Sequence, residues 1–246
     1  MIDFAYEALP TDELRIGLIV LQTDESLERD LRQLIPAQIN LLVSRVPSGD
    51  EVTPDTLRQM ARDLPAAARL LPQAQSYAVI GYGCTSGSAI IGPAVVSKLV
   101  RAAAPTPEVT NPVSALVAAC AALGLRRLAV LSPYVAEVSD RLRDVLADEG
   151  IDTPVFGSFN EAREDRVVRI APVSILAAAE ALAAKGGVDG IFLSCTNLRT
   201  LEVIAALEAR TGLPVLSSNQ VLGWHMLRRA GVGDRMQGYG RLFAEC

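Results

Sequence analysis

The sequence predicts an α/β protein of two pseudo-symmetric Rossmann-like lobes, each with a parallel sheet flanked by helices, and with a cleft between the lobes. Short apolar runs alternate with helical patterns along the whole chain. Half of the 246 residues are hydrophobic but only 4% are aromatic, so an aliphatic core is expected. Such a core favours alternating strands and helices over a β-sandwich. The same motifs also recur in both halves of the chain.

The first half of the chain contains three buried strands, each followed by a helix. Ile16–Leu21 is an apolar run typical of a strand that is covered on both faces. Thr53 and Pro54 are typical of a helix N-terminus. Strands separated by helices imply right-handed crossovers and a parallel sheet. We expect strands at residues 15–21, 39–46 and 77–81, and helices at residues 26–34, 54–70 and 90–103.

The second half repeats this alternation. A helix that starts at Pro112 ends at Gly124, a residue that commonly stops helices, and the apolar run Arg127–Leu131 follows as a strand. We expect strands at residues 127–131, 152–156, 190–194 and 214–217, and helices at residues 112–123, 136–149, 172–184, 201–210 and 220–230.

Two pairs of matching segments show that the halves are related. Tyr77–Ser86 matches Asp189–Asn197, and Arg15–Leu21 matches Arg126–Ser132, both at an offset of 111 residues. Two unrelated segments would rarely share one offset, so we expect two similar lobes, each with a strand that ends in Cys-Thr. The predicted lobes are residues 1–111 together with 218–246, and residues 112–217.

The composition excludes several classes of function. A net charge of −5 and a pI near 5.0 argue against a nucleic-acid partner. Lys98 and Lys185 are the only lysines and His225 is the only histidine, so Schiff-base catalysis has few candidates and multi-histidine metal sites are excluded. The four cysteines form no CxxC pair, which excludes zinc-knuckle and thioredoxin-type sites.

The N-terminal residues and the apolar runs indicate the cellular location of the protein. The N-terminus is acidic where a signal peptide is basic and then apolar, and the apolar stretch at residues 115–125 is too short to span a bilayer. We expect a cytoplasmic protein with reduced thiols, no membrane partner, and no metal or organic cofactor. The Ala-rich helix at residues 114–123 suits the interface of a homo-oligomer (dimer or tetramer) or, as an alternative, the core.

Cys84 and Cys195 are the strongest candidates for chemistry. Each follows a predicted strand, and open parallel sheets bind ligands beyond the carboxyl ends of their strands. Backbone N–H groups of the turns that follow can converge on an anion, and they lower the pKa of a thiol. If the lobes face each other, a small carboxylate between them has a sulfur on each face. These turn residues are Thr85, Ser86, Thr196 and Asn197.

This arrangement suits two reactions. One thiolate can remove a proton from a stereocentre while the opposite thiol delivers one, or a sulfur can attack an electron-poor double bond. A single buried cysteine usually only packs in the core, but two at matching positions favour catalysis. Cys120 lies in an Ala-rich helix and is predicted to be core, and Cys246 is predicted to be an exposed tail.

Five short motifs follow one another along nearly the whole chain. They are Gly17–Val20, Gly83–Gly87, Leu131–Tyr134, Ser194–Asn197 and Ser217–Gln220. With them the chain resembles the aspartate/glutamate racemase superfamily, specifically its branch of maleate cis-trans isomerases and arylmalonate decarboxylases. The resemblance implies an active site in the cleft between the lobes and a cofactor-independent reaction on a small carboxylic acid. The decarboxylases of this branch keep only the second cysteine, so the pair in this chain favours an isomerase or racemase.

The resemblance also implies roles for individual residues. Cys84 would be the nucleophile or first acid/base, and Cys195 the second proton donor or acceptor. Tyr134 and Asn160 would hydrogen-bond a substrate carboxylate. A buried tyrosine bonded to backbone and an ordinary turn are the alternatives for these two. The resemblance implies anion-binding groups at Thr85, Ser86 and Thr196.

The loop after the first strand departs from the family pattern. In maleate isomerases it resembles Pro-Ser-Ser-Asn, whose asparagine contacts a substrate carboxylate. Here it runs from Leu21 to Ser26, with Gln22 and Asp24 as candidate substrate contacts. Asp24 either repels a second carboxylate, accepts a hydrogen bond from an amine or amide, or caps the following helix. The loop resembles that of the members linked to ectoine utilisation, whose substrate would be a cyclic or acylated diamino acid.

Other functions stay open at this point. An arylmalonate-type decarboxylase would share the fold and the second cysteine. A cysteine hydrolase would need His225 beside a thiol, although the position of His225 in a helix favours a structural role. A two-lobed protein that only binds a small molecule would not require paired thiols. A dinucleotide enzyme is poorly supported, because neither Cys-Thr turn carries GxGxxG.

Overall fold

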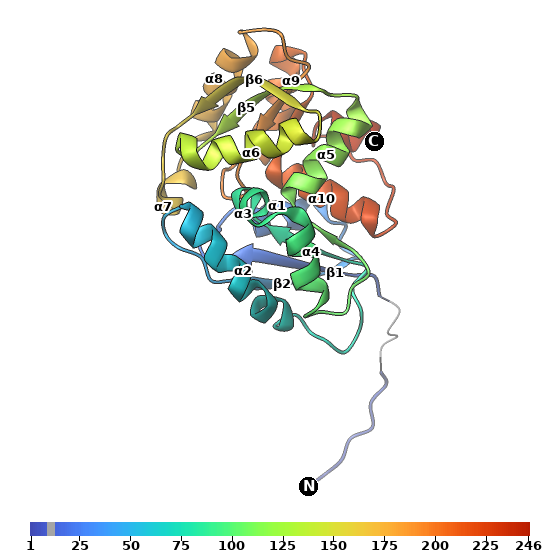
Figure 1. The fold of residues 1–246 in the computed structure, drawn as a ribbon. Coiled ribbons are helices and arrows are strands. Elements are labelled where there is room, and N and C mark those ends of the chain that lie inside the picture. Colours follow the sequence, from blue (N-terminus) through green and yellow to red (C-terminus); the bar gives the residue numbers. More distant parts are fainter. Residues whose placement is uncertain (9–12) are drawn as a thin grey trace.

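The computed structural model describes residues 1–8 and 13–246, which contain two parallel sheets of four strands each (Figure 1). The strand orders are β2-β1-β3-β4 and β6-β5-β7-β8, so the two sheets have the same topology. This confirms the predicted pair of Rossmann-like lobes. Residues 9–12, part of the N-terminal stretch in which we predicted no signal peptide, lie outside the described residues.

The first sheet and its helices come from the N-terminal half of the chain. Its strands are β1 (Arg15–Leu21), β2 (Asn40–Val46), β3 (Val79–Gly83) and β4 (Val109–Thr110). The helices are α1 (Leu27–Leu34), α2 (Pro54–Arg69), α3 (Thr85–Ile91), α4 (Pro93–Arg101) and α5 (Pro112–Leu123).

The second sheet and its helices follow in the same order. Its strands are β5 (Arg127–Ser132), β6 (Asp152–Ser158), β7 (Gly190–Leu193) and β8 (Val215–Ser217). The helices are α6 (Ala136–Asp148), α7 (Glu164–Val167), α8 (Pro172–Ala183), the 3-10 turn η1 (Leu201–Val203), α9 (Ile204–Thr211), α10 (Ser218–Arg229) and α11 (Arg241–Glu245).

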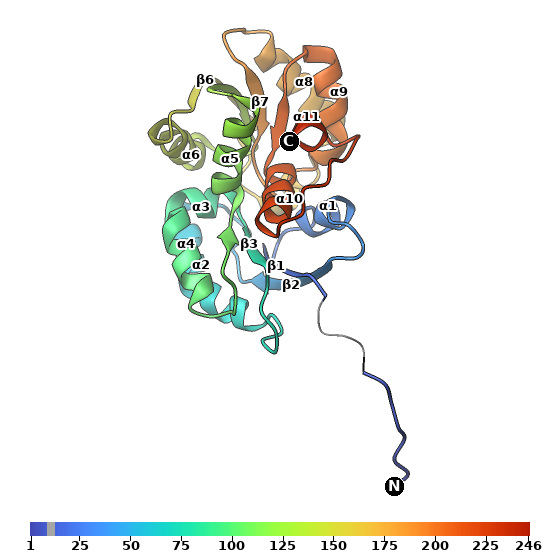
Figure 2. The ribbon, with the colours of Figure 1, turned by 90° about the vertical axis from the view of Figure 1, so that its right-hand side faces the viewer.

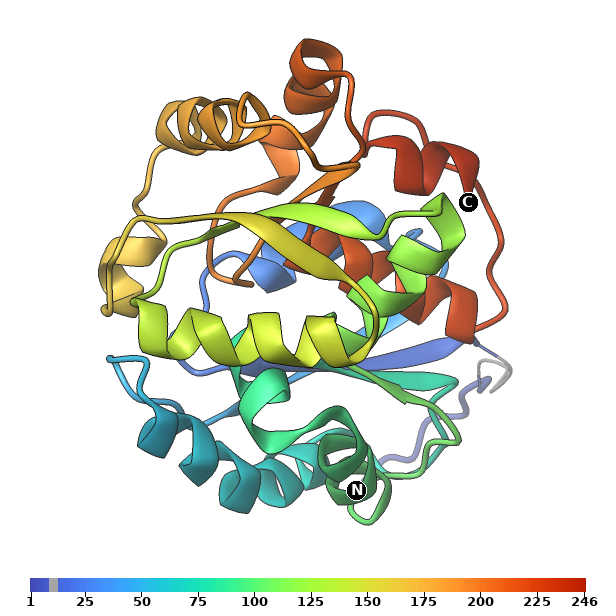
Figure 3. The same cartoon turned by 45° about the horizontal axis from the view of Figure 1, so that its top comes forward.

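The central strands are buried because helices cover both faces of each sheet. Every residue of β3 and β7 is buried, which explains why these strands are continuous apolar runs without polar alternation. The two lobes also meet through helices, since α6 of the second lobe packs against α3 of the first (Figure 3).

The helix α10 connects the end of the second sheet to the first lobe. It follows β8 directly but packs against β3, α1 and α5 (Figure 2). Its start therefore lies at the border between the lobes, close to the ends of β3 and β7. This packing is consistent with the division in which residues 218–246 join the first lobe, and that division stays a prediction.

The largest difference between prediction and structure lies around Cys84. The strand predicted at residues 77–81 is observed at Val79–Gly83. The helix predicted at residues 90–103 is divided at Gly92 into α3, which already starts at Thr85, and α4. The prediction of a loop after Cys84 is wrong because the Cys84 thiol accepts the backbone N–H of Gly87 and caps α3 directly. The short elements β4, α7 and α11 were not predicted.

The contact between β3 and α1 leaves no room for a side chain at Gly83. A Cβ atom there would overlap Cδ2 of Leu27, which is fully buried. We expect Gly83→Ala to lower the free energy of unfolding by about 1–3 kcal/mol, because Leu27 must shift within a packed core. Gly233→Ala is the control, since a Cβ there meets no described atom within 4 Å. Equal stability of the two variants in urea unfolding would contradict this tight contact.

Candidate active site

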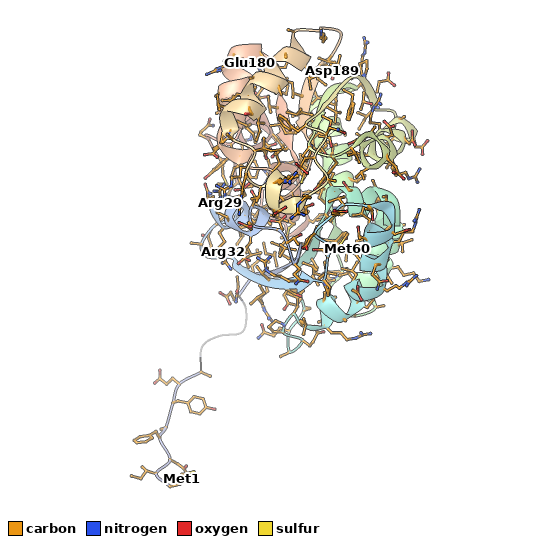
Figure 4. The ribbon with its side chains drawn as sticks, turned by 90° about the vertical axis from the view of Figure 1, so that its left-hand side faces the viewer. Met1, Arg29, Arg32, Met60, Glu180 and Asp189 are labelled. Carbon is orange, nitrogen blue, oxygen red and sulfur yellow. The ribbon has the colours of Figure 1, made fainter. Side chains whose placement is uncertain are left out.

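A pocket of about 380 Å³, counting its open mouth, lies between the two lobes where β1, β3, β5 and β7 end. Met60 of α2, labelled in Figure 4 close to the border between the lobes, belongs to its apolar side. The apolar lining is Leu21, Val52, Leu57 and Met60. The polar lining includes Cys84, Thr85, Ser86, Tyr134, Glu164, Cys195 and Thr196. The structure thus brings the two predicted cysteines to one pocket, one from each lobe.

Cys84 is held at the first turn of α3. Its thiol is buried, and its Sγ accepts a hydrogen bond from the backbone N–H of Gly87 at 3.1 Å. Gly87 is required there, because a Cβ atom would lie 2.9 Å from this sulfur and 2.6 Å from the Tyr82 hydroxyl. The capping role fixes the direction in which the sulfur points.

Cys195 follows β7 in an unusual backbone conformation. Its φ of 105° lies in a region that residues with a side chain rarely adopt, and its N–H donates to Ser218 Oγ at 3.0 Å. Its Sγ lies 2.9 Å from the Tyr134 hydroxyl and accepts the N–H of Asn197 at 3.3 Å. The strained backbone is therefore held by contacts on both sides of the residue.

Burial keeps both thiols protonated in the free protein. Burial raises the pKa of Cys84 to about 12, although the Gly87 N–H opposes this shift. Burial and the charge of Glu164 raise the pKa of Cys195, whereas the Tyr134 hydroxyl and the Asn197 N–H lower it. A thiolate at either position thus depends on these donors and on the charges that a ligand brings.

Glu164 is a pocket residue that the sequence analysis missed. It starts the short helix α7, is only 2% exposed, and accepts hydrogen bonds from the Tyr134 hydroxyl at 2.6 Å and from Asn197 Nδ2 at 2.7 Å. Burial raises the pKa of its carboxyl group, while these two donors lower it. One signal was available: Glu164 precedes the buried Val167 by three residues, so helical spacing places both on one face.

Tyr134 and Asn197 bind protein groups around this carboxylate. The Tyr134 hydroxyl contacts Glu164 and Cys195 rather than backbone, so the backbone-bonded alternative is wrong. Asn197 donates to Glu164 and accepts the backbone N–H of Glu25 at 2.9 Å. Asn197 thereby joins the loop after β1 to the loop after β7. A contact of either side chain with substrate stays a prediction.

Asp24 caps a helix, as one of its predicted roles states. Its Oδ1 accepts the backbone N–H groups of Ser26 and Leu27 at 2.9 and 2.8 Å, at the start of α1. Its other oxygen, Oδ2, is buried without a hydrogen-bond partner among the described residues. Burial raises the pKa of this carboxyl group. Capping therefore accounts for only one of the two oxygens.

The predicted anion-binding residues lie at the pocket, and two of their hydroxyls are already engaged. Thr85 Oγ1 donates to Ser218 Oγ at 2.8 Å, and Thr196 Oγ1 donates to the backbone oxygen of Gly83 at 3.3 Å. These bonds connect the turn after β3 with the turn after β7 and with α10. Together with Ser86, these residues line the pocket.

Four predicted site residues do not line the pocket. Asp24 and Asn197 are buried, whereas Gln22 and Asn160 are exposed. Asn160 has a φ of 54°, and its N–H donates to Ser158 Oγ at 2.9 Å, as in a turn. Substrate contacts for Gln22 and Asn160 stay predictions that would require the loops to move.

His225 lies away from the thiols. Its Nδ1 is 2.7 Å from Thr110 Oγ1 and its Nε2 accepts from Arg229 at 3.1 Å. Burial lowers the pKa of its imidazole to about 4. This position supports the structural role over a Cys-His hydrolase, since His225 does not line the pocket.

Within residues 1–8 and 13–246, no group of three or more His, Cys, Asp or Glu residues is placed to hold a metal ion. The helices in the described part of the chain are also too short or too polar to cross a membrane.

The chain matches known protein sequences over nearly its whole length. The arylmalonate decarboxylase family matches residues 16–243. Arylmalonate decarboxylase of Bordetella bronchiseptica is 32% identical over 235 residues, which cover 94% of this chain and 96% of that protein. Maleate isomerase of Nocardia farcinica is 23% identical over 243 residues, with coverage of 94% and 96%.

Solved structures of maleate isomerases share the fold. The maleate isomerase Iso of Pseudomonas putida S16 superposes with a TM-score of 0.83 at 24% identity, covering 94% of this chain and 98% of that chain. A cysteine-to-serine variant of the Nocardia farcinica maleate cis-trans isomerase, which holds a covalently bound succinylcysteine intermediate, has a TM-score of 0.82 at 23% identity and covers 95% and 99% of the two chains.

The Tyr134 hydroxyl is expected to control the reactivity of Cys195. Tyr134→Phe removes the hydroxyl that contacts its sulfur and lowers its pKa, so the pKa of Cys195 rises further and the thiolate fraction at pH 8 falls. We expect alkylation of Cys195 by iodoacetamide to slow by about tenfold, the effect of losing one hydrogen bond to a charged group, as followed by mass spectrometry of the Cys195 peptide. Tyr77→Phe, which alters a hydroxyl bound to the Pro72 backbone oxygen, is the control. Faster alkylation in Tyr134→Phe than in the control would contradict this role.

Proposed function

The chain belongs to the arylmalonate decarboxylase family, and from this premise we propose that it is a cofactor-independent isomerase or racemase of a small carboxylic acid. In this proposal Cys84 and Cys195 act from opposite faces of the substrate. The observation that carries it is that both thiols line one pocket, each at the end of the equivalent strand of its lobe.

The proposed chemistry starts with the loss of one thiol proton. In a racemase, the thiolate takes the proton from the carbon next to the substrate carboxylate, and the thiol on the other face delivers its proton to that carbon. The electron pair moves onto the carboxylate in between, where the backbone N–H groups of Thr85, Ser86 and Thr196 would stabilise it. The Asn197 N–H would stabilise the thiolate of Cys195, and the Tyr134 hydroxyl would do so by turning its proton from Glu164 to the sulfur.

A cis-trans isomerase would use the same groups differently. One sulfur adds to the double bond and the electron pair moves toward a substrate carboxylate. Rotation about the resulting single bond, followed by loss of the sulfur, restores the double bond in the other geometry. The succinylcysteine found in the Nocardia farcinica relative supports covalent addition as an available route in this fold.

Decarboxylation of an arylmalonate-type substrate is the second candidate. It is favoured by the identity of 32% to the Bordetella bronchiseptica decarboxylase, against 23% to the Nocardia farcinica maleate isomerase. One cysteine that protonates the product carbanion would suffice for it. The second thiol in the pocket is the reason why we place isomerisation or racemisation first.

Further parts of the proposal rest on the sequence. An ectoine-derived amino acid as substrate follows from the loop Leu21–Ser26 and has no support from the relatives, whose names refer to maleate and arylmalonate. The cytoplasmic location of the protein and its assembly into a dimer or tetramer are likewise predictions.

Proton NMR in D₂O tests the two-thiol reaction. With maleate, chiral amino acids and N-acylated diamino acids as the panel, we expect either double-bond isomerisation or deuterium entry at a stereocentre. Cys84→Ser and Cys195→Ser should each lower turnover by about 10²–10⁴-fold, since each removes a proton-transferring group. Cys246→Ser is the control, because this thiol lies outside the pocket.

Three results would contradict the proposal. A wild-type rate in either of the two pocket variants, with a native circular dichroism spectrum, would exclude the two-thiol reaction. Release of CO₂ from an arylmalonate by the Cys84→Ser variant at the wild-type rate would favour the decarboxylase. Tight binding of a panel member without turnover, unchanged in both variants, would favour a binding protein.

A further inference from the structure

The charged side chains that line the pocket are all acidic. Its described lining contains no lysine, arginine or histidine, but it contains Glu164 in its interior and Glu51 at its exposed edge. Asp24 lies next to Glu25, whose backbone N–H binds Asn197, the side chain that also binds Glu164. The pocket lining therefore offers negative charge to a ligand and contains no cation, although the charge of Arg45 acts on Asp24 from outside the lining.

Arg45 and Arg163, two arginines near the pocket, are engaged elsewhere. Arg45 Nη1 donates to the backbone oxygens of Leu21 and Asp24 at 2.9 Å each, and its Nη2 pairs with Glu28 at 3.3 Å. Arg163 pairs with the exposed Asp165 at 3.0 Å. Neither guanidinium group lines the pocket or forms a salt bridge with Glu164.

The two buried carboxylates retain acceptor capacity. Each oxygen of Glu164 accepts one hydrogen bond, from Tyr134 or Asn197, and a carboxylate oxygen can accept two. Asp24 Oδ2 accepts none from the described residues although the side chain is only 3% exposed. An unpaired buried charge costs free energy, and a positively charged ligand group would relieve that cost.

We propose that the pocket selects a carboxylate that also carries a protonated nitrogen group, an ammonium or amidinium, and that Glu164 binds this group with Asp24 adding to the negative field. This assignment rests on the proposed function for the position of the substrate. The substrate carboxylate lies at the Cys-Thr turns, and the nitrogen group lies toward α7. A dicarboxylate would instead place its second negative charge against Glu164.

Two matched ligand pairs test the charge preference. Glutarate and 4-aminobutyrate share one carboxylate and three methylene groups and differ only in the end group. Glutamate and 2,4-diaminobutyrate share an α-amino acid group and two methylene groups and differ only in the side-chain end group, so the ammonium member of a pair is the one whose end group is an ammonium. Dissociation constants come from the thermal stabilisation of the protein at increasing ligand concentration. We expect the ammonium member of each pair to bind about tenfold more tightly, the effect of one partly solvated ion pair.

Substitutions test whether Glu164 and Asp24 cause the preference for the ammonium ligand. Glu164→Gln removes the charge and should abolish the preference for the ammonium member. Asp24→Asn keeps the helix-capping oxygen and should reduce the preference, which provides a second variant if Glu164→Gln does not fold. The matched control is Glu25→Gln, an exposed neighbour of Asp24 whose loss changes the net charge equally. This control should keep the wild-type ratio.

Defined results would overturn the inference. Equal or tighter binding of the dicarboxylate members by the wild type, or no stabilisation by any ammonium member, would exclude the charge preference. An unchanged ratio in both Glu164→Gln and Asp24→Asn would exclude these residues as its source. Because the readout is binding, Cys84→Ser can lack all turnover and still keep the preference, so failure of the proposed reaction and failure of this inference are separate results.

Discussion

The hydroxyl group of Ser218 joins the two halves of the site. It accepts the backbone N–H of Cys195 at 3.0 Å and the hydroxyl of Thr85 at 2.8 Å, so one side chain at the start of α10 contacts both Cys-Thr turns. Ser218 is fully buried, as is Asn219 beside it, which donates to the backbone oxygen of Thr196. Since buried polar groups without partners are costly, this arrangement holds the turns in fixed relative positions.

Pseudo-symmetry brings the thiols to one pocket, but their surroundings differ. Cys84 ends its strand as the cap of α3, with one backbone donor to its sulfur. Cys195 lies in a strained loop, and its sulfur contacts the hydroxyl of Tyr134, which is bonded to Glu164. Only the second thiol therefore belongs to a hydrogen-bonded network that includes an acid. Because their surroundings differ, the thiols of Cys84 and Cys195 differ in acidity. A reaction in which one thiol accepts a proton and the other donates one would use this difference.

The network of Tyr134, Glu164 and Asn197 would link the reactivity of the Cys195 thiol to the proposed preference for a cationic ligand. Asn197 and Tyr134 hold the carboxylate of Glu164 at the pocket, and the negative charge of Glu164 raises the pKa of Cys195. A cation beside Glu164 would weaken that effect and favour the thiolate. Binding of the correct ligand and activation of the thiol would thus depend on one carboxylate, because both are responses to the same local charge.

The sequence by itself determined the fold class, the repeat and the pair of Cys-Thr motifs that follow β3 and β7. These properties depend on apolar runs and on the parallel arrangement of strands, both of which are local or periodic in the chain. The family resemblance also pointed to Tyr134 and Thr196, and both line the pocket. The start of α3 was missed because a cysteine is an uncommon helix cap.

Only the tertiary structure decided which polar residues meet around the thiols. Glu164 lies within the charged run Glu161–Arg166, which has the composition of an exposed turn, and its burial follows from the contacts of this segment with the loops after β2 and β7. Asn160, in the same loop, is exposed instead. The contacts of Glu164 with Tyr134 and Asn197 span 30 and 33 residues, and no local pattern in the chain encodes contacts at such separations.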